Sequence, residues 1–137
     1  MKITIIGNTY KIKHDLLERV AEATFSFMNK KDGDIELKFI STKKMTELNL
    51  GYRGINKPTD VLSFNISDSP LVGQIFICYT YTVKQAASIC NDLSNEFCLL
   101  LVHGILHIYG FDHNTEKEAE IMQSLERKIL KREGFIQ

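Results

Sequence analysis

The chain has 137 residues, a length that fits one globular domain. Hydrophobic residues make up 44% of the sequence and charged residues 25%, and these proportions exclude disordered and fibrous proteins. Seventeen basic residues balance seventeen acidic ones, which argues against nonspecific coating of nucleic acid but not against a local basic cleft.

Cysteine usage and hydropathy bear on the cellular location. Cys78, Cys90 and Cys98 are odd in number and form no C-x-x-C pair, so we expect buried free thiols in a reducing compartment rather than a disulfide framework. The first residues hold too short an apolar run for a signal peptide. The longest apolar run, residues 97–102, is far shorter than the roughly 20 residues that span a bilayer. We therefore expect a cytoplasmic protein that does not enter a membrane.

The first part of the chain alternates strands and helices. Apolar residues are spaced for a helix over residues 14–30 and alternate with charged residues over 35–39. In chain order we predict a strand at 2–6 ended by Gly7-Asn8, a helix at 14–30, a strand at 35–39 and a short helix that Thr42 caps. A strand–helix–strand unit favours a right-handed crossover, so the first two strands should pair in parallel.

The rest of the chain adds two strands and three helices. We predict a loop at 51–59, where Gly51, Gly54 and Pro58 forbid a regular element, then a strand at 60–66, a turn at 67–73 and a strand at 74–79. Strands joined this closely are most simply antiparallel neighbours. Helices follow at 82–90, 95–109 and 116–132, the last with a capping box at Thr115 and Glu118. The prediction is a single domain over residues 1–137 with a small mixed four-stranded sheet and about five helices.

Three of the four histidines lie within the segment LLLVHGILHIYGFDHN. His103 and His107 are four residues apart on a predicted helix, which places their Cβ atoms about 5–6 Å apart on one face. Two imidazole nitrogens at this spacing can reach one zinc ion at about 2.0–2.1 Å. A single histidine on an apolar helix more often only packs, as we expect His14 to lie on the surface, but this cluster predicts a metal site.

His113 needs a change of chain direction to join the other two. It lies six residues after His107 and would point away from it on a continued helix. Gly110 permits the left-handed conformation that ends helices, with Phe111 packing back on Leu106. Three histidine ligands leave one coordination position open, as in catalytic zinc sites that lower the pKa of bound water.

Two residues next to the histidines limit the reaction mechanisms that this site could support. Gly104 stands where H-E-x-x-H proteases carry their general-base Glu, so a zinc-protease mechanism lacks its base. We expect Gly104 to admit close packing of a neighbouring segment instead. Asp112 directly precedes His113, and it orients an imidazole, forms the turn or adds a ligand; we favour the first two roles.

At these residues the sequence resembles a known family. HGILHIYGFDH is similar to the H-G-x-L-H-x-x-G-[YF]-D-H signature of the bacterial YbeY family, single-strand-specific endoribonucleases also called rRNA maturation factors. NLGYRGINKPTDVLSF resembles the family block N-x-x-[YF]-R-x-x-x-x-P-T-D-V-L-S-F, and GQIFIC resembles its G-D-I-x-I strand. These segments cover most of residues 45–113 in the family's order and spacing.

The resemblance implies a zincin-like α+β fold, with one zinc ion on His103, His107 and His113 and with Arg53 contributing to catalysis near the metal. It also implies RNA as the substrate, in particular the 3′ end of small-subunit ribosomal RNA. The implied role is in ribosome maturation and quality control, with the ribosome or its small subunit as partner. One position departs from the family, because Gln74 stands in place of Asp and would change the charge of the cleft if it lies there.

Apart from the histidines, several residues are candidates for contacting RNA or for shaping the cleft. A guanidinium such as that of Arg53 can grip phosphate with two parallel hydrogen bonds, although a lone loop arginine is more often solvated. Thr59 and Asp60 are expected to fix the loop before a strand, with a smaller chance of lining the cleft. Further candidates for RNA contacts, each more often ordinary surface, are Tyr52, Lys57 and Lys11.

The resulting hypothesis is metal-assisted phosphodiester cleavage in which Arg53 stabilises the transition state and the nucleophile is water or the ribose 2′-hydroxyl. Three alternatives stay open: a metallohydrolase acting on peptides or small amides, a ribosome-associated factor whose zinc is structural, and a packed domain without metal. Zinc is the expected ion, although imidazole ligands also suit nickel, copper and iron.

Overall fold

The computed structural model describes residues 2–7, 12–68 and 70–135, which form a mixed sheet and five helices. In chain order the elements are β1 (Lys2–Ile6), α1 (His14–Phe27), β2 (Asp34–Ile40), α2 (Thr42–Arg53), β3 (Val61–Asp68), β4 (Leu71–Cys78), α3 (Tyr79–Ser88), α4 (Leu93–Ile108) and α5 (Glu116–Arg132). The predicted α+β class is confirmed. Asn8 and Lys11, named in the sequence analysis, lie outside the described residues.

The strands lie in the order β1-β2-β4-β3. β1 pairs with β2 in parallel, β2 pairs with β4 in parallel, and β3 pairs with β4 antiparallel, as predicted for the first and last strand pairs. β3 is therefore an edge strand, and one of its long edges is free to border a cleft.

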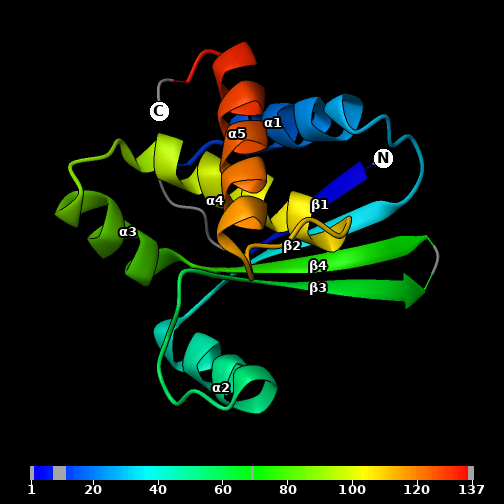
Figure 1. Cartoon of the computed structure of the whole chain (residues 1–137). Coiled ribbons are helices and arrows are strands. Elements are labelled where there is room, and N and C mark those ends of the chain that lie inside the picture. Colours follow the sequence, from blue (N-terminus) through cyan, green and yellow to red (C-terminus); the bar gives the residue numbers. More distant parts are fainter. Residues whose placement is uncertain (1, 8–11, 69, 136–137) are drawn as a thin grey trace.

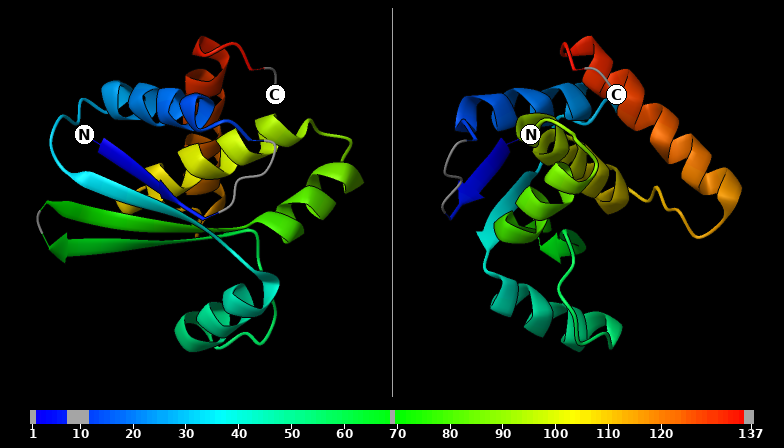
Figure 2. Two further views of the ribbon diagram at one scale, coloured as in Figure 1. Left: turned by 180° about the vertical axis from the view of Figure 1, so that it is seen from behind. Right: turned by 90° about the vertical axis from the view of Figure 1, so that its left-hand side faces the viewer.

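The helices cover the sheet unequally. Figures 1 and 2 show α1, α4 and α5 on one face, α2 alone on the other, and α3 beyond one end of the strands. The main core lies on the three-helix side, where α4 is buried along most of its length. A smaller core of Met45, Leu62 and Cys78 lies beneath α2. This arrangement leaves the end of α2 and the edge of β3 near the exposed side of α4.

Two glycines let α4 lie directly on β4. A Cβ atom on Gly104 would lie 3.0 Å from atoms of Ile75, and one on Gly73 would lie 2.5 Å from Cδ1 of Ile108. Both distances are shorter than ordinary carbon contacts. The expectation that Gly104 admits close packing is confirmed, and the contact fixes the height of α4 and its histidines above the sheet.

Several helix boundaries differ from the prediction. α1 ends at Phe27 rather than near residue 30, because Asn29 takes a left-handed φ of 57° and closes the helix. α2 runs on to Arg53 and includes Gly51, which was expected in a loop, and the left-handed Gly54 ends it. Its N-cap is Ser41, whose hydroxyl accepts from the Lys44 amide, rather than Thr42.

The strand boundaries also differ, because the hydrogen-bonded pairing of β3 with β4 extends into the segment that was predicted to be a turn. The expected turn at 67–73 is largely strand, since β3 reaches Asp68 and β4 begins at Leu71. α3 begins at Tyr79, three residues before the predicted start. Backbone pairing between adjacent strands outweighs local turn propensity here.

No single helix among the described residues has the length and apolar composition needed to cross a membrane. α3 and α4 reach that length and composition only when added together across a bend of 118°. Most of α4 is buried in the core, as is usual for a central helix of a globular domain.

Candidate active site

A cavity of about 460 Å³ lies where α2, β3 and α4 meet. That volume falls within the roughly 300–1,000 Å³ typical of ligand pockets. Its lining residues are Tyr52 and Arg53 from α2, Val61, Leu62, Ser63 and Phe64 from β3, His103 and His107 from α4, and Asp112, His113 and Asn114 from the turn that follows. The cavity therefore brings together Arg53 and the three histidines that the sequence analysis selected.

The three imidazole rings line the same cavity, and the ring of His113 lies close to those of the other two histidines. The centroids of His103 and His113 lie 5.4 Å apart, and those of His107 and His113 lie 6.3 Å apart. In the part of the chain that the structure describes, no group of three or more His, Cys, Asp or Glu side chains is placed so that it could hold a metal ion. The rings are thus grouped, and their role as ligands stays a prediction.

The turn that carries His113 forms as the sequence predicts. Gly110 has a φ of 97°, its amide donates to the His107 carbonyl, and the Phe111 amide donates to the Leu106 carbonyl. These two hydrogen bonds define a Schellman motif. Phe111 also packs against the core cluster that includes Leu106. The reversal brings His113 back toward the histidines of α4.

Asp112 stabilises this turn through both of its carboxylate oxygens. Oδ1 accepts from the His113 amide at 2.8 Å, and Oδ2 accepts from Asn114 Nδ2 at 2.8 Å. Of the roles considered for Asp112, the turn-forming one matches the structure. A different residue orients an imidazole.

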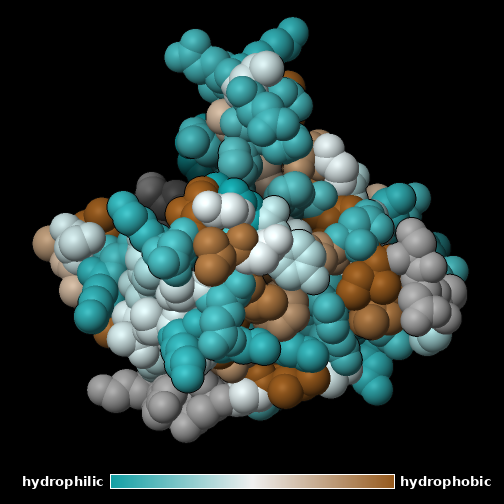
Figure 3. Space-filling view, turned by 90° about the horizontal axis from the view of Figure 1, so that it is seen from below, coloured by the Kyte–Doolittle hydropathy of each residue, from teal (hydrophilic) through white to brown (hydrophobic). Residues whose placement is uncertain are grey.

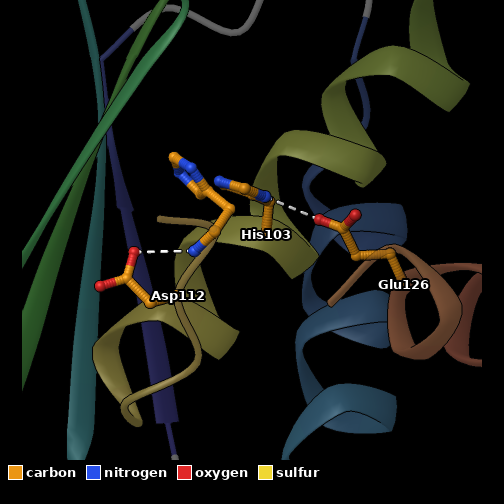
Figure 4. A network of polar contacts seen from close by, with 4 residues as sticks. His103, Asp112 and Glu126 are labelled. Atoms are coloured by element: carbon orange, nitrogen blue, oxygen red, sulfur yellow. Dashed lines mark hydrogen bonds and ion pairs between the residues drawn. The ribbon is translucent and has the colours of Figure 1, made fainter. Parts of the chain in front are cut away.

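That residue is Glu126, which the sequence analysis missed. Its Oε2 lies 2.7 Å from His103 Nδ1, and Figure 4 shows it reaching from α5 to the side of His103 opposite Asp112. The Glu126 side chain is only 8% exposed. A neutral imidazole whose Nδ1–H donates to this carboxylate carries its lone pair on Nε2, the nitrogen on the other side of the ring. A signal was present in the sequence, since Glu126 occupies the core-facing stripe of α5 with Met122, Ile129 and Leu130.

The electrostatic environment favours neutral imidazole at His107. Partial burial lowers the pKa of His107 below its usual 6.5, and the neighbouring His103 and His113 rings lower it further. Asp112 opposes this shift with its negative charge. His107 is therefore held in the neutral form that binds metal ions.

Arg53 reaches the cavity from the last turn of α2. Ser41 begins the helix, Gly54 ends it, and the amide of Gly54 donates to the Leu50 carbonyl. Within the described residues the Arg53 side chain is exposed and has no ion-pair partner. Its guanidinium is thus available to an anionic group in the cavity.

The other candidates lie outside the cavity lining. Lys57 is exposed, and its carbonyl accepts from the buried Asn49 amide at 2.7 Å. Asp60 is architectural, because its carboxylate accepts from the Val61 amide and from Gln85 Nε2. His14 is exposed at the start of α1. These placements agree with the roles expected from the sequence.

Gln74 lies on the sheet rather than in the cleft. Its Nε2 donates to Glu36 Oε1 at 2.8 Å, and the two residues are register partners of β4 and β2. The replacement of the family's Asp therefore leaves the lining of the cavity unchanged.

The comparisons with known proteins agree on one family. A family model described as Endoribonuclease YbeY matches residues 3–134. A relative named Endoribonuclease YbeY from Legionella pneumophila (strain Corby) is 37% identical over 114 residues, which cover 78% of this chain and 72% of the relative. One of the same name from Phytoplasma australiense is 37% identical over 140 residues, covering 96% and 95%.

A solved structure extends this agreement to the fold. The solution structure of TM1509 from Thermotoga maritima has 27% sequence identity and a TM-score of 0.66, and the match covers 95% of this chain and 90% of that one. By sequence and by fold, the chain belongs to the YbeY endoribonuclease family.

Proposed function

We propose that this protein is a zinc-dependent endoribonuclease that cleaves single-stranded RNA. One observation carries the proposal: Arg53 and all three histidines line a single cavity, in a chain of the YbeY endoribonuclease family. The family resemblance extends the proposal to the 3′ end of small-subunit ribosomal RNA, with roles in maturation and quality control of cytoplasmic ribosomes.

The donor chemistry of the cavity fits a zinc ion. Three imidazoles are common zinc ligands at catalytic sites, and they leave a fourth position open. A ligating histidine usually donates its second ring N–H to a carboxylate or carbonyl, and the Glu126–His103 pair supplies this feature. The lowered pKa of His107 also keeps a lone pair available for a cation.

The proposed roles follow from the chemistry of each side chain. When bound, zinc supplies Lewis acidity to the site. His103, His107 and His113 hold the ion, and Glu126 keeps His103 in the tautomer that presents Nε2. Arg53 binds a phosphate oxygen and stabilises the negative charge that develops during cleavage.

The described lining of the cavity provides no free carboxylate that could act as the general base in peptide hydrolysis. Asp112 is the only carboxylate among its described lining residues, and both of its oxygens are engaged in the turn. A zinc protease needs a free carboxylate as general base. This observation favours RNA over a peptide or amide substrate.

Metal content and RNA cleavage test the proposal together. We expect about one zinc per untagged wild-type chain, and cleavage of a labelled single-stranded RNA that a chelator abolishes. His107→Ala should lose zinc and activity, whereas His14→Ala, an exposed histidine outside the cavity, should keep both. Arg53→Ala should bind zinc normally but cleave roughly 100-fold more slowly. Arg127→Ala, on the exposed side of α5, is its matched control.

Three results would contradict the proposal. Zinc-free wild-type protein, even after incubation with the ion, would remove the metal centre. Cleavage that survives both chelation and His107→Ala would place the chemistry elsewhere. If zinc binds but no RNA is cut, and the protein still associates with ribosomes after Arg53→Ala, a ribosome-associated factor with structural zinc becomes the better description.

A further inference from the structure

Tyr52 is an unusually exposed aromatic residue at the candidate active site. Its side chain lies in the last turn of α2, directly before Arg53, and the residue is 66% exposed. It nevertheless lines the same cavity as Arg53 and the histidines. An exposed aromatic ring at the rim of a polar cavity offers an apolar surface to whatever the cavity binds.

The ring of Tyr52 is supported from one side. Its centroid lies 4.4 Å from that of Phe64 on β3, with 45° between the planes, and Phe64 in turn meets Phe76 on β4 edge-on at 5.7 Å. Such aromatic pairs add about 0.5–1.5 kcal/mol beyond the area they bury. The sheet thus holds the ring in place while most of its surface stays in solvent.

The surroundings favour a small flat ligand rather than a protein partner. Figure 3 shows the molecule from below, the side on which α2 lies, and its hydrophobic side chains form small separate patches among hydrophilic ones. Protein interfaces usually bury a continuous patch of about 800 Å² per partner. A single exposed ring next to a guanidinium that has no ion-pair partner among the described residues matches one nucleotide, with a flat base and an anionic phosphate.

We propose that Tyr52 is a base-stacking residue that receives one unpaired nucleobase of the RNA while Arg53 binds a neighbouring phosphate. This inference rests on the proposed function and names a determinant of its substrate. A base inside a duplex has both faces covered by its neighbours, whereas a base in a single strand can leave the stack and lie on an aromatic side chain. Tyr52 thereby makes the cavity select single-stranded RNA, with little dependence on base identity.

Equilibrium binding measurements separate the contribution of base stacking to RNA affinity from that of phosphate charge. A labelled single-stranded RNA and an abasic ribose-phosphate oligomer of equal length are titrated, with chelator present to prevent cleavage. We expect Tyr52→Leu to weaken RNA binding roughly 5- to 150-fold, as is typical of losing one stacked base. Binding of the abasic oligomer should not change. Tyr52→Phe keeps the ring and should bind like wild type.

Fluorescence provides a direct readout, because the chain has no tryptophan. Tyr52→Trp places one indole at the site, and single-stranded RNA should quench its emission whereas the abasic oligomer should not. Ile89→Ala is the surface control, since Ile89 is 60% exposed and lies outside the lining of the cavity. This variant should bind both oligomers normally.

The outcomes separate this inference from the proposed function. Normal RNA binding by Tyr52→Leu, or an equal loss for RNA and abasic oligomer, would overturn the stacking role while cleavage by the wild type stands. A wild-type protein that neither binds nor cleaves RNA would overturn the proposed function, and the stacking role with it.

Discussion

Glu126 Oε2 lies 2.7 Å from His103 Nδ1, so the last helix of the chain supports a histidine on the central one. The carboxylate is buried between α4 and α5, and the ring that it holds faces the cavity. A buried carboxylate needs hydrogen-bond donors to offset its lost hydration. His103 supplies one, and in return the carboxylate fixes the orientation of the imidazole ring.

Glu126→Gln should therefore weaken zinc binding by about tenfold, the lower end of the roughly 10–100-fold range for partners of metal-ligating histidines. The amide keeps the size of the side chain but accepts a weaker hydrogen bond than a carboxylate. Competition with a chromophoric chelator measures the dissociation constant.

Glu120→Gln is the matched control, because Glu120 is exposed on the same helix. Denaturant unfolding of both metal-free variants checks that the fold is intact. Equal zinc affinity in the two variants would show that the Glu126–His103 contact has no influence on the metal.

The histidine cluster illustrates what local sequence can predict. The spacing of His103 and His107 follows from the helical repeat, and the reversal at Gly110 depends on a few consecutive residues. Glu126 was harder to find, because its partner lies 23 residues away and only the packing of α5 on α4 brings them together. In the sequence, a buried contact of this kind is indicated only by a carboxylate residue among the apolar residues on the core-facing side of a helix.

Longer-range contacts set the remaining features. The placement of Arg53 in the cavity requires α2 to continue three residues into the predicted loop, as far as Arg53, and to pack against the sheet near β3. The extents of β3 and β4 depend on their mutual hydrogen bonding, which outweighs the turn propensity of the segment between them. Neither effect can be derived from the residues of one element alone.

The three cysteines should differ in reactivity because their burial differs. Cys78 and Cys98 are fully buried, as expected from the sequence, whereas Cys90 is exposed, contrary to that expectation. Cys90 ends the turn after α3 with a left-handed φ of 54°, which places it at the surface. Burial raises the pKa of Cys98 to about 12, so its reactive thiolate is scarce at neutral pH.

The number of accessible cysteine thiols can be measured with a colourless disulfide reagent that releases a coloured thiolate on reaction. We expect one fast-reacting thiol per native chain and three after unfolding in denaturant. Cys90→Ser should abolish the fast phase. Rapid modification of two or more thiols in the native protein would mean that the core opens more readily than this packing allows.

Gln74→Asp, which restores the family residue, should destabilise this particular chain. The new carboxylate would face Glu36 across the β2–β4 pair, where Gln74 now donates a hydrogen bond. Like charges directly opposite in a sheet are destabilising, and we expect a loss of about 0.2–1 kcal/mol, the size of other cross-strand pair interactions. Urea unfolding should show this loss at low salt and a smaller one at high salt, because salt screens the repulsion.

Glu36→Gln in the same chain should recover the stability, since it removes the repulsion. RNA cleavage should change little in any of these variants, because Gln74 does not line the cavity. An unchanged unfolding midpoint for Gln74→Asp would show that the two side chains separate freely in solution.

The stability of the metal-free protein should fall with acid partly through His107. Its pKa is lowered in the folded chain, first by burial and then by His103, so between 6.5 and the folded pKa the unfolded chain binds more protons. The contribution of His107 is therefore fully present above pH 6.5 and is lost as the pH falls through this window. Because the residue is partly exposed to solvent, the effect should be small.

Urea unfolding of the chelator-treated protein at pH 7.5 and pH 5.5 measures this contribution. Wild type should lose more stability between the two values than His107→Gln, which cannot take up the proton. His14→Gln should behave like wild type, because His14 is exposed and lies outside the lining of the cavity. If His107→Gln and wild type have the same pH dependence, His107 is protonated as easily in the folded chain as in the unfolded one. The clustered rings would then not hold it in the neutral, metal-binding form.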